Sequence, residues 1–151
     1  MIAMEEKGQL GMWPVSCEIP VMWGDLDALN HVNHTVYLKW METARMNYFE
    51  ICGLSELLRD KGIGPILAGL KIDYLAPVLF PDTVTVRTTV SRIGNSSFDM
   101  EYKVSSNSLG GKEVARATVF GVLFDYKNLQ KFTIPIGIRD RIVEIESPNL
   151  D

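Results

Sequence analysis

The chain has 151 residues, of which 46% are hydrophobic and 23% are charged. This length and composition are typical of one globular domain that buries a conventional core without disulfides or a structural metal. Fifteen lysines and arginines against nineteen aspartates and glutamates give a formal net charge of −4. This balance provides no basic field for a polyanion, so we expect no nucleic-acid partner.

The two cysteines, Cys17 and Cys52, stand far apart and match no zinc-ligand or redox spacing. We therefore expect a reduced protein of the cytoplasm. The first eight residues include acidic side chains and lead into no apolar run, unlike a signal peptide. No segment approaches the ~20 apolar residues that span a bilayer, so we expect no membrane partner.

Alternating apolar residues over 15–23 predict a half-buried strand. Because Pro20 has no N–H group for a sheet ladder, this strand is predicted at an edge or with a bulge. The polar stretch at 24–34 is too rich in turn-forming residues for a helix or a strand. Apolar spacings of three and four from Thr35 to Cys52 predict a helix of about five turns, with Gly53 as a left-handed cap.

A shorter helix is predicted from an N-cap at Ser55 to Lys61, where Gly62 ends it. Beyond it the apolar residues alternate with a period of two, which predicts strands at 70–74, 83–90, 98–105, 114–124 and 132–134. Short turns between these strands favour an antiparallel meander. The result is an α+β fold in which a strongly curved sheet covers the long apolar helix.

We interpret the whole chain as a single domain. Its predicted core spans about 13–135, with an N-terminal tail at 1–12 and a C-terminal segment at 136–151. No internal repeat, linker or low-complexity run divides it.

The polar stretch concentrates the candidate site residues. Asp25 and Asp27 and both histidines of the chain, His31 and His34, fall within ten residues. The stretch leads into the N-terminus of the long helix, where N–H groups without acceptors and the helix dipole can stabilise an oxyanion. A carboxylate beside that end can attack a polarised carbonyl or activate a water against it. These residues therefore suit an acyl-transfer or hydrolysis site.

Other interpretations stay open from the residues alone. Asp25, Asp27 and Asn33 also suit turns and helix caps, where they would only satisfy backbone N–H groups. The two aspartates and two histidines could instead ligate a metal, although their spacing is a weak metal signature. Glu42 and Arg45, one turn apart on the long helix, favour an ion pair or an interface feature.

This region resembles the hotdog-fold acyl-CoA thioesterases, in particular the 4-hydroxybenzoyl-CoA thioesterase family. The family pattern runs D-x-D-x-x-G-x-V and then Y-x-x-[WF]-x-[DE]-x-[AS]-R. This chain has Asp25-Leu-Asp27-Ala-Leu-Asn30-His31-Val32 and then Tyr37-Leu-Lys-Trp40-Met-Glu42-Thr-Ala-Arg45. The likeness extends from about Val15 to Pro135. It departs at Asn30, which replaces the family glycine but tolerates the left-handed backbone of such a turn.

The resemblance implies a hotdog fold, an antiparallel curved sheet of five to six strands wrapped around one long central helix. It implies hydrolysis of an acyl-CoA or a related acyl thioester to free acid and thiol, with no cofactor beyond the coenzyme A of the substrate and no metal. It also implies a homodimer with two sheets joined edge to edge and each active site built from both subunits. A homotetramer is the alternative assembly.

Residue by residue, the resemblance assigns the catalytic carboxylate to Asp27, as nucleophile or general base. It assigns the N–H of His34 to the thioester carbonyl. The supporting loop would comprise Asp25, His31 and Asn33, the acyl pocket Tyr37, Trp40 and Met41, and the coenzyme A contacts Arg92, Asn95, Ser96 and Ser97. Glu42 is a reserve candidate for the catalytic acid, because some hotdog thioesterases use a helix glutamate.

Two rival functions are consistent with this fold. An acyl-thioester hydratase or dehydratase would carry a different pattern around its catalytic histidine, and this chain lacks that pattern. A non-catalytic acyl-CoA-binding protein would bind the thioester without releasing thiol. The acyl pocket residues are likewise consistent with plain core packing.

Overall fold

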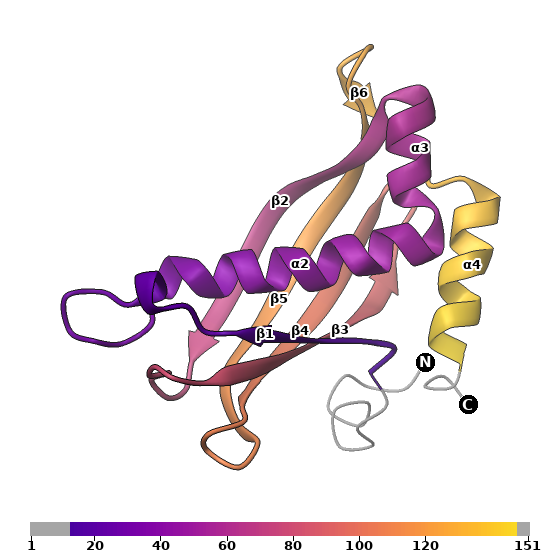
Figure 1. The fold of residues 1–151 in the computed structure, drawn as a ribbon. Coiled ribbons are helices and arrows are strands. Elements are labelled where there is room, and N and C mark those ends of the chain that lie inside the picture. Colours follow the sequence, from indigo (N-terminus) through magenta and orange to yellow (C-terminus); the bar gives the residue numbers. More distant parts are fainter. Residues whose placement is uncertain (1–12, 148–151) are drawn as a thin grey trace.

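The computed structural model describes residues 13–147 as a six-stranded antiparallel sheet wrapped around one long helix (Figure 1). The elements are β1 (Val15–Pro20), the 3-10 turn η1 (Trp23–Asp25), α2 (His34–Cys52), α3 (Leu54–Lys61), β2 (Ile63–Tyr74), β3 (Thr83–Ile93), β4 (Ser97–Ser106), β5 (Lys112–Asp125), β6 (Gln130–Lys131) and α4 (Ile136–Glu146). The predicted curved sheet around a central helix is confirmed. The predicted tail at 1–12 lies outside the described residues. Among those described, no helix is long and apolar enough to cross a bilayer.

Consecutive strands pair with each other only in the centre of the sheet, from β3 through β4 to β5. The strand order is β1-β3-β4-β5-β2, every pair is antiparallel, and β6 adds a short pairing to β5. The chain therefore crosses from β2 to the other half of the sheet before β3, which corrects the prediction that consecutive strands pair throughout. β1 lies at one edge, as Pro20 predicted. β2 forms the other edge, and its outer side has no strand partner among the described residues.

Several element boundaries differ from the sequence prediction. β2 begins at Ile63, seven residues before the predicted strand at 70–74, and β1 ends at Pro20 rather than at 23. The N-cap of α3 is Gly53, with φ 96°, because this left-handed residue ends α2 and begins α3 directly; Ser55 therefore lies inside the helix. β6 lies two residues before the predicted strand at 132–134, because the left-handed Leu129 turns the chain back early. α4 lies beyond the predicted core boundary at 135, yet it contacts α2 and β3.

The core lies between α2 and the concave face of the sheet. Met41, Ala44 and Tyr48 of α2 and Val86 and Tyr102 of the sheet belong to one buried cluster, and none is more than 1% exposed. Figure 1 shows the helix lying across the strands. Burial of the helix side that carries these spaced apolar residues holds α2 in place and sets the position of both its ends.

One buried carboxylate connects α4 to the rest of the fold. Glu146 is 2% exposed and accepts a hydrogen bond from the Tyr48 hydroxyl of α2 at 2.6 Å. On β3 it accepts two more, from the Thr89 hydroxyl at 2.5 Å and the Val90 N–H at 2.9 Å. Burial, together with the charge of Glu146, raises the pKa of Tyr48, so the phenol remains a donor. Among the described residues β1 pairs with β3 only as far as Thr88, and Glu146 accepts hydrogen bonds from the next two residues of β3.

Glu146→Ala should lower the free energy of unfolding by about 3 kcal/mol, because it removes a buried acceptor of three hydrogen bonds and leaves the buried Tyr48 hydroxyl without the acceptor it has here. Urea denaturation followed by circular dichroism measures this loss. Glu144→Ala is the matched control, since Glu144 has an exposed side chain on the same helix and should change stability by less than about 0.5 kcal/mol. Equal midpoints for the two variants would contradict the anchoring role of Glu146.

Candidate functional site

The loop between β1 and α2 holds the predicted site residues in a compact turn. The Asp27 N–H donates to the His31 carbonyl at 2.8 Å and closes the turn. Asn30 has φ 63°, so the residue that replaces the family glycine adopts the left-handed geometry predicted for it. The Val32 N–H donates to the Val78 carbonyl at 2.9 Å, which fixes the loop against the segment before β3.

Asp27 caps this loop with one of its carboxylate oxygens. Its Oδ1 accepts hydrogen bonds from the Leu29 N–H at 2.8 Å and the His31 N–H at 3.4 Å. Within residues 13–147, no hydrogen-bond donor reaches its Oδ2. The side chain is half-buried and lines none of four cavities of the molecule, which are the three described below and one between β3 and α4. The loop therefore orients the carboxylate through one oxygen and leaves the other without a partner in the described chain.

Asp25 and Asn33 satisfy backbone groups at the two ends of the loop. Asp25 Oδ2 accepts from the Met22 N–H at 2.8 Å, and the Asp25 carbonyl accepts from the Asn33 N–H at 2.9 Å. Asn33 is the N-cap of α2, and its Oδ1 accepts from both the N–H and the hydroxyl of Thr35 at 2.9 Å. Both side chains thus act as caps.

His34 is the first residue of α2, and its side chain is exposed. Its carbonyl accepts from the Tyr74 hydroxyl at 3.0 Å, and the two rings lie edge to face with centroids 6.3 Å apart. In the described part of the chain its own N–H has no acceptor, because the cap oxygen of Asn33 is bonded to Thr35. This N–H, at the positive end of the helix dipole, can therefore donate to a substrate oxygen.

A metal site at the loop is not supported by the arrangement of its residues. Across residues 13–147, no group of three or more His, Cys, Asp or Glu side chains is placed to hold a metal ion. Asp25 and Asp27 each direct a carboxylate oxygen at backbone N–H groups. His31 and His34 are exposed.

Two of the three predicted acyl pocket residues are core residues. Tyr37 and Trp40 are 3% and 4% exposed, have ring centroids 5.0 Å apart and line none of the four cavities. Burial raises the pKa of Tyr37, so its phenol is neutral. Met41 is also buried but borders a cavity of about 200 Å³ between α2 and β2. Helical spacing predicts which side chains face the sheet, but it does not predict which of them border empty space.

A cleft lies between α2 and the β2 edge of the sheet. It consists of two adjoining cavities, of about 240 and 200 Å³, that share Glu42, Arg45, Leu67 and Val119 in their walls. The larger cavity is otherwise lined mostly by apolar side chains from α2, α3, β2 and β4. A concave, mostly apolar site with a few polar groups is the usual form of a small-molecule pocket.

Glu42 and Arg45 do not form the predicted ion pair. Arg45 instead donates to the hydroxyl of the buried Tyr102 at 3.2 Å and lies 5.9 Å from the centre of that ring. No salt bridge within the described chain includes Glu42. Both side chains therefore border the cleft as separate polar groups.

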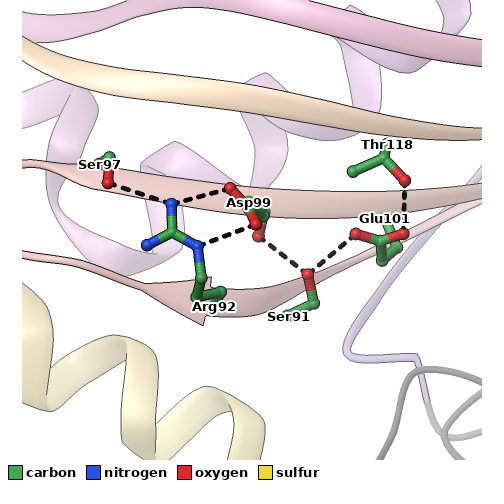
Figure 2. A network of polar contacts seen from close by, with 6 residues as sticks. All are labelled: Ser91, Arg92, Ser97, Asp99, Glu101 and Thr118. Carbon is green, nitrogen blue, oxygen red and sulfur yellow. Dashed lines mark hydrogen bonds and ion pairs between the residues drawn. The ribbon is translucent and has the colours of Figure 1, made fainter.

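Arg92, a predicted coenzyme A contact, is already paired within the sheet. Its Nε and Nη2 donate to the two carboxylate oxygens of Asp99 at 2.9 and 3.0 Å, and Nη2 also donates to the Ser97 hydroxyl at 3.1 Å (Figure 2). The Ser96 carbonyl accepts from the Leu123 N–H at 2.7 Å. In the structure the Arg92 guanidinium and the Ser97 hydroxyl link β3 to β4, and the predicted contacts of both residues with coenzyme A stay predictions.

Asn95, in contrast, borders an open cavity of about 1040 Å³ at the opposite end of α2 from the Asp27 loop. Of the described residues, three cationic side chains, Lys61, Lys131 and Arg139, line this cavity, and no acidic side chain does. Arg139 donates to the Gly94 carbonyl at 2.8 Å, whereas the two lysines form no ion pair with the described residues. Sequence reasoning missed this basic cavity because its cations come from α3, β6 and α4.

The chain is similar to known proteins in both sequence and fold. The sequence profile described as the thioesterase-like superfamily matches residues 21–142. Acyl-CoA thioesterase YbgC of Haemophilus influenzae is 26% identical over 126 residues, which cover 82% of this chain and 90% of that protein. The 4-hydroxybenzoyl-CoA thioesterase of a Pseudomonas species is 26% identical over 95 residues, 60% of this chain and 67% of that protein. A thioesterase structure from Thermus thermophilus, complexed with coenzyme A and Zn, matches with a TM-score of 0.79 and 32% identity, covering 89% of this chain and 96% of that one.

Proposed function

Since the chain belongs to the thioesterase-like superfamily, we propose that it hydrolyses an acyl-CoA to the free acid and coenzyme A. One observation carries this proposal: among residues 13–147 the N–H of His34 at the start of α2 has no acceptor, and the loop just before it orients the Asp27 carboxylate. Similarity to proteins named for acyl-CoA substrates supports coenzyme A as the carrier.

In the proposed reaction, the thioester carbonyl oxygen accepts a hydrogen bond from the His34 N–H. The α2 dipole then stabilises the negative charge that develops on this oxygen. Asp27 either attacks the carbonyl carbon and forms an anhydride that water hydrolyses, or takes a proton from a water that attacks directly. In both routes the carbon–sulfur bond breaks, one water is consumed, and the products are the acid and the thiol. The proposed chemistry uses only protein groups and water.

A second copy of the chain would complete this site. The cleft borders Leu67 on β2, whereas the Asp27 loop adjoins the far end of that strand, where the Tyr74 hydroxyl meets His34. Two copies paired antiparallel along β2 would bring the His34 end of each opposite the cleft of the other. Leu67 and Leu70 are 49% and 38% exposed on this edge strand, which supports such pairing. Each active site would then combine Asp27 of one copy with the cleft of its partner.

The basic cavity is the proposed binding site for the phosphate groups of coenzyme A. Lys61 and Lys131 line it without ion-pair partners among the described residues, so their ammonium groups can bind phosphate. Asn95, predicted as a coenzyme A contact, borders the same cavity. In the antiparallel pair, the end of one copy that holds the basic cavity would lie on the same side as the Asp27 loop of the other copy. One substrate molecule would therefore contact the basic cavity of one copy and the Asp27 loop of its partner.

Asp27→Asn should lower kcat by about 100-fold or more with little change in substrate affinity, because it removes a group that acts mainly in the transition state. A thiol reagent that detects free coenzyme A measures the rate over a panel of acyl-CoA substrates. Asp25→Asn is the matched control and should stay within about threefold of the wild-type rate, since Asp25 is a cap.

The opposite ranking of the Asp27 and Asp25 variants would overturn the residue assignment. Wild-type protein that binds acyl-CoA but turns it over no faster than Asp27→Asn would favour the non-catalytic binding function. Conversion of a β-hydroxyacyl-CoA without thiol release would favour the hydratase or dehydratase.

Ala68 allows a test of the proposed β2 pairing that leaves the sheet intact. The β2–β5 register skips Ala68 between Leu67 and Gly69, and proline is tolerated at such bulges. Ala68→Pro should therefore stay folded, sediment as a monomer and lose most of its hydrolysis, whereas Ala68→Ser should behave as wild type. Analytical ultracentrifugation and the thiol assay measure both properties. A monomeric variant with full activity would exclude the composite site.

Lys131→Glu should raise KM for an acyl-CoA about tenfold, because it replaces an attractive charge beside the phosphates with a repulsive one. The same acyl group carried on N-acetylcysteamine should be hydrolysed at the wild-type rate, since this thiol has no phosphate. Lys112→Glu, an exposed lysine outside the cavity, is the control. An equal fall in the rate of hydrolysis of both substrates would contradict phosphate binding at this cavity.

A further inference from the structure

Ser55 on α3 lies in the wall of the larger, 240 Å³ cavity of the cleft. The residue is 7% exposed, and its Oγ is buried without a hydrogen-bond partner among the described residues. A buried hydroxyl without a partner is unfavourable, and alanine at this helical position would avoid that penalty and favour the helix more strongly. The position of Ser55 beside a cavity therefore points to a hydrogen-bond partner that occupies this cavity.

The remaining walls of the cavity restrict what that partner can be. Its side chains are mostly apolar, and the two charged ones, Glu42 and Arg45, have opposite signs. A charged substituent would lose its hydration in this cavity, and the walls carry no net opposite charge to offset that cost. A neutral polar group has a much smaller free-energy cost of desolvation. The cavity thus suits an acyl group with a neutral polar substituent.

We infer that Ser55 is a specificity-determining residue that pairs with a neutral hydroxyl or keto group on the acyl part of the substrate. A serine hydroxyl both donates and accepts, so it can bond either substituent. Rotation about the Cα–Cβ bond moves Oγ among three staggered positions and lets it turn toward a group in the cavity. The inference rests on the proposed function, since it takes the cleft as the acyl site.

The test uses hexanoyl-CoA and benzoyl-CoA, each compared with its derivatives that carry one hydroxyl at each available position. Wild-type protein should prefer at least one derivative over its parent by about tenfold in kcat/KM, because one hydrogen bond to a buried group is gained. Ser55→Ala should reduce this preference, the ratio of kcat/KM for the derivative to that for its parent, to about one. Ser105→Ala is the matched control, since Ser105 is a buried serine on β4 that does not line the cavity.

Two further readouts separate this inference from the proposed function. Thioether analogues of the same panel cannot be hydrolysed, and calorimetry measures whether their binding shows the same Ser55-dependent preference. Thermal unfolding of Ser55→Ala should give a Tm equal to or above that of the wild type, because a hydroxyl without a partner is removed. A lower Tm with an unchanged preference would show a purely structural serine and overturn the inference. If the binding preference depends on Ser55 but no thioester is hydrolysed, the role of Ser55 in specificity is upheld while the proposed function fails.

Discussion

Burial of α2 against the concave face of the sheet is the constraint on which the other features depend. Met41, Ala44 and Tyr48 are almost completely buried, so the helix cannot slide or rotate without exposing them. Its N-terminus therefore holds the His34 N–H at a fixed place beside the Asp27 loop. Its middle and C-terminal parts hold one wall of the cleft against β2. The hydrophobic contact that stabilises the fold thus also sets the geometry of the candidate site.

The features that local chemistry determines could be predicted from the sequence. Gly53 and Asn30 adopt the left-handed conformations expected of them, and the long helix has the predicted extent within one residue. Features that depend on partners distant in the sequence could not be predicted. Glutamate is rarely buried without a partner, yet Glu146 is buried and accepts hydrogen bonds from Tyr48 and Val90, which lie on two other elements. The ion pair expected between Glu42 and Arg45 fails because the Tyr102 hydroxyl, from β4, offers Arg45 another partner.

Three regions along the molecule differ in their chemistry. The loop before α2 carries a carboxylate and a backbone donor, the cleft beside β2 is mostly apolar, and the cavity at α3, β6 and α4 is basic. An acyl-CoA has the same three parts: a reactive carbonyl, an apolar acyl group and a phosphorylated carrier. Motif reading finds the first part because its residues are adjacent in sequence. The other two are assembled from separate elements and appear only in the folded chain.

Gly53 is both the last cap of α2 and the first cap of α3, so a single left-handed residue sets the angle between the two helices. α3 can therefore vary in sequence, and with it Ser55 and Leu58 of the cleft wall, without any change at the opposite end of α2. Under the proposed function, substitutions in this one short helix would alter which acyl groups the cleft accepts, while the loop before α2 would keep its geometry.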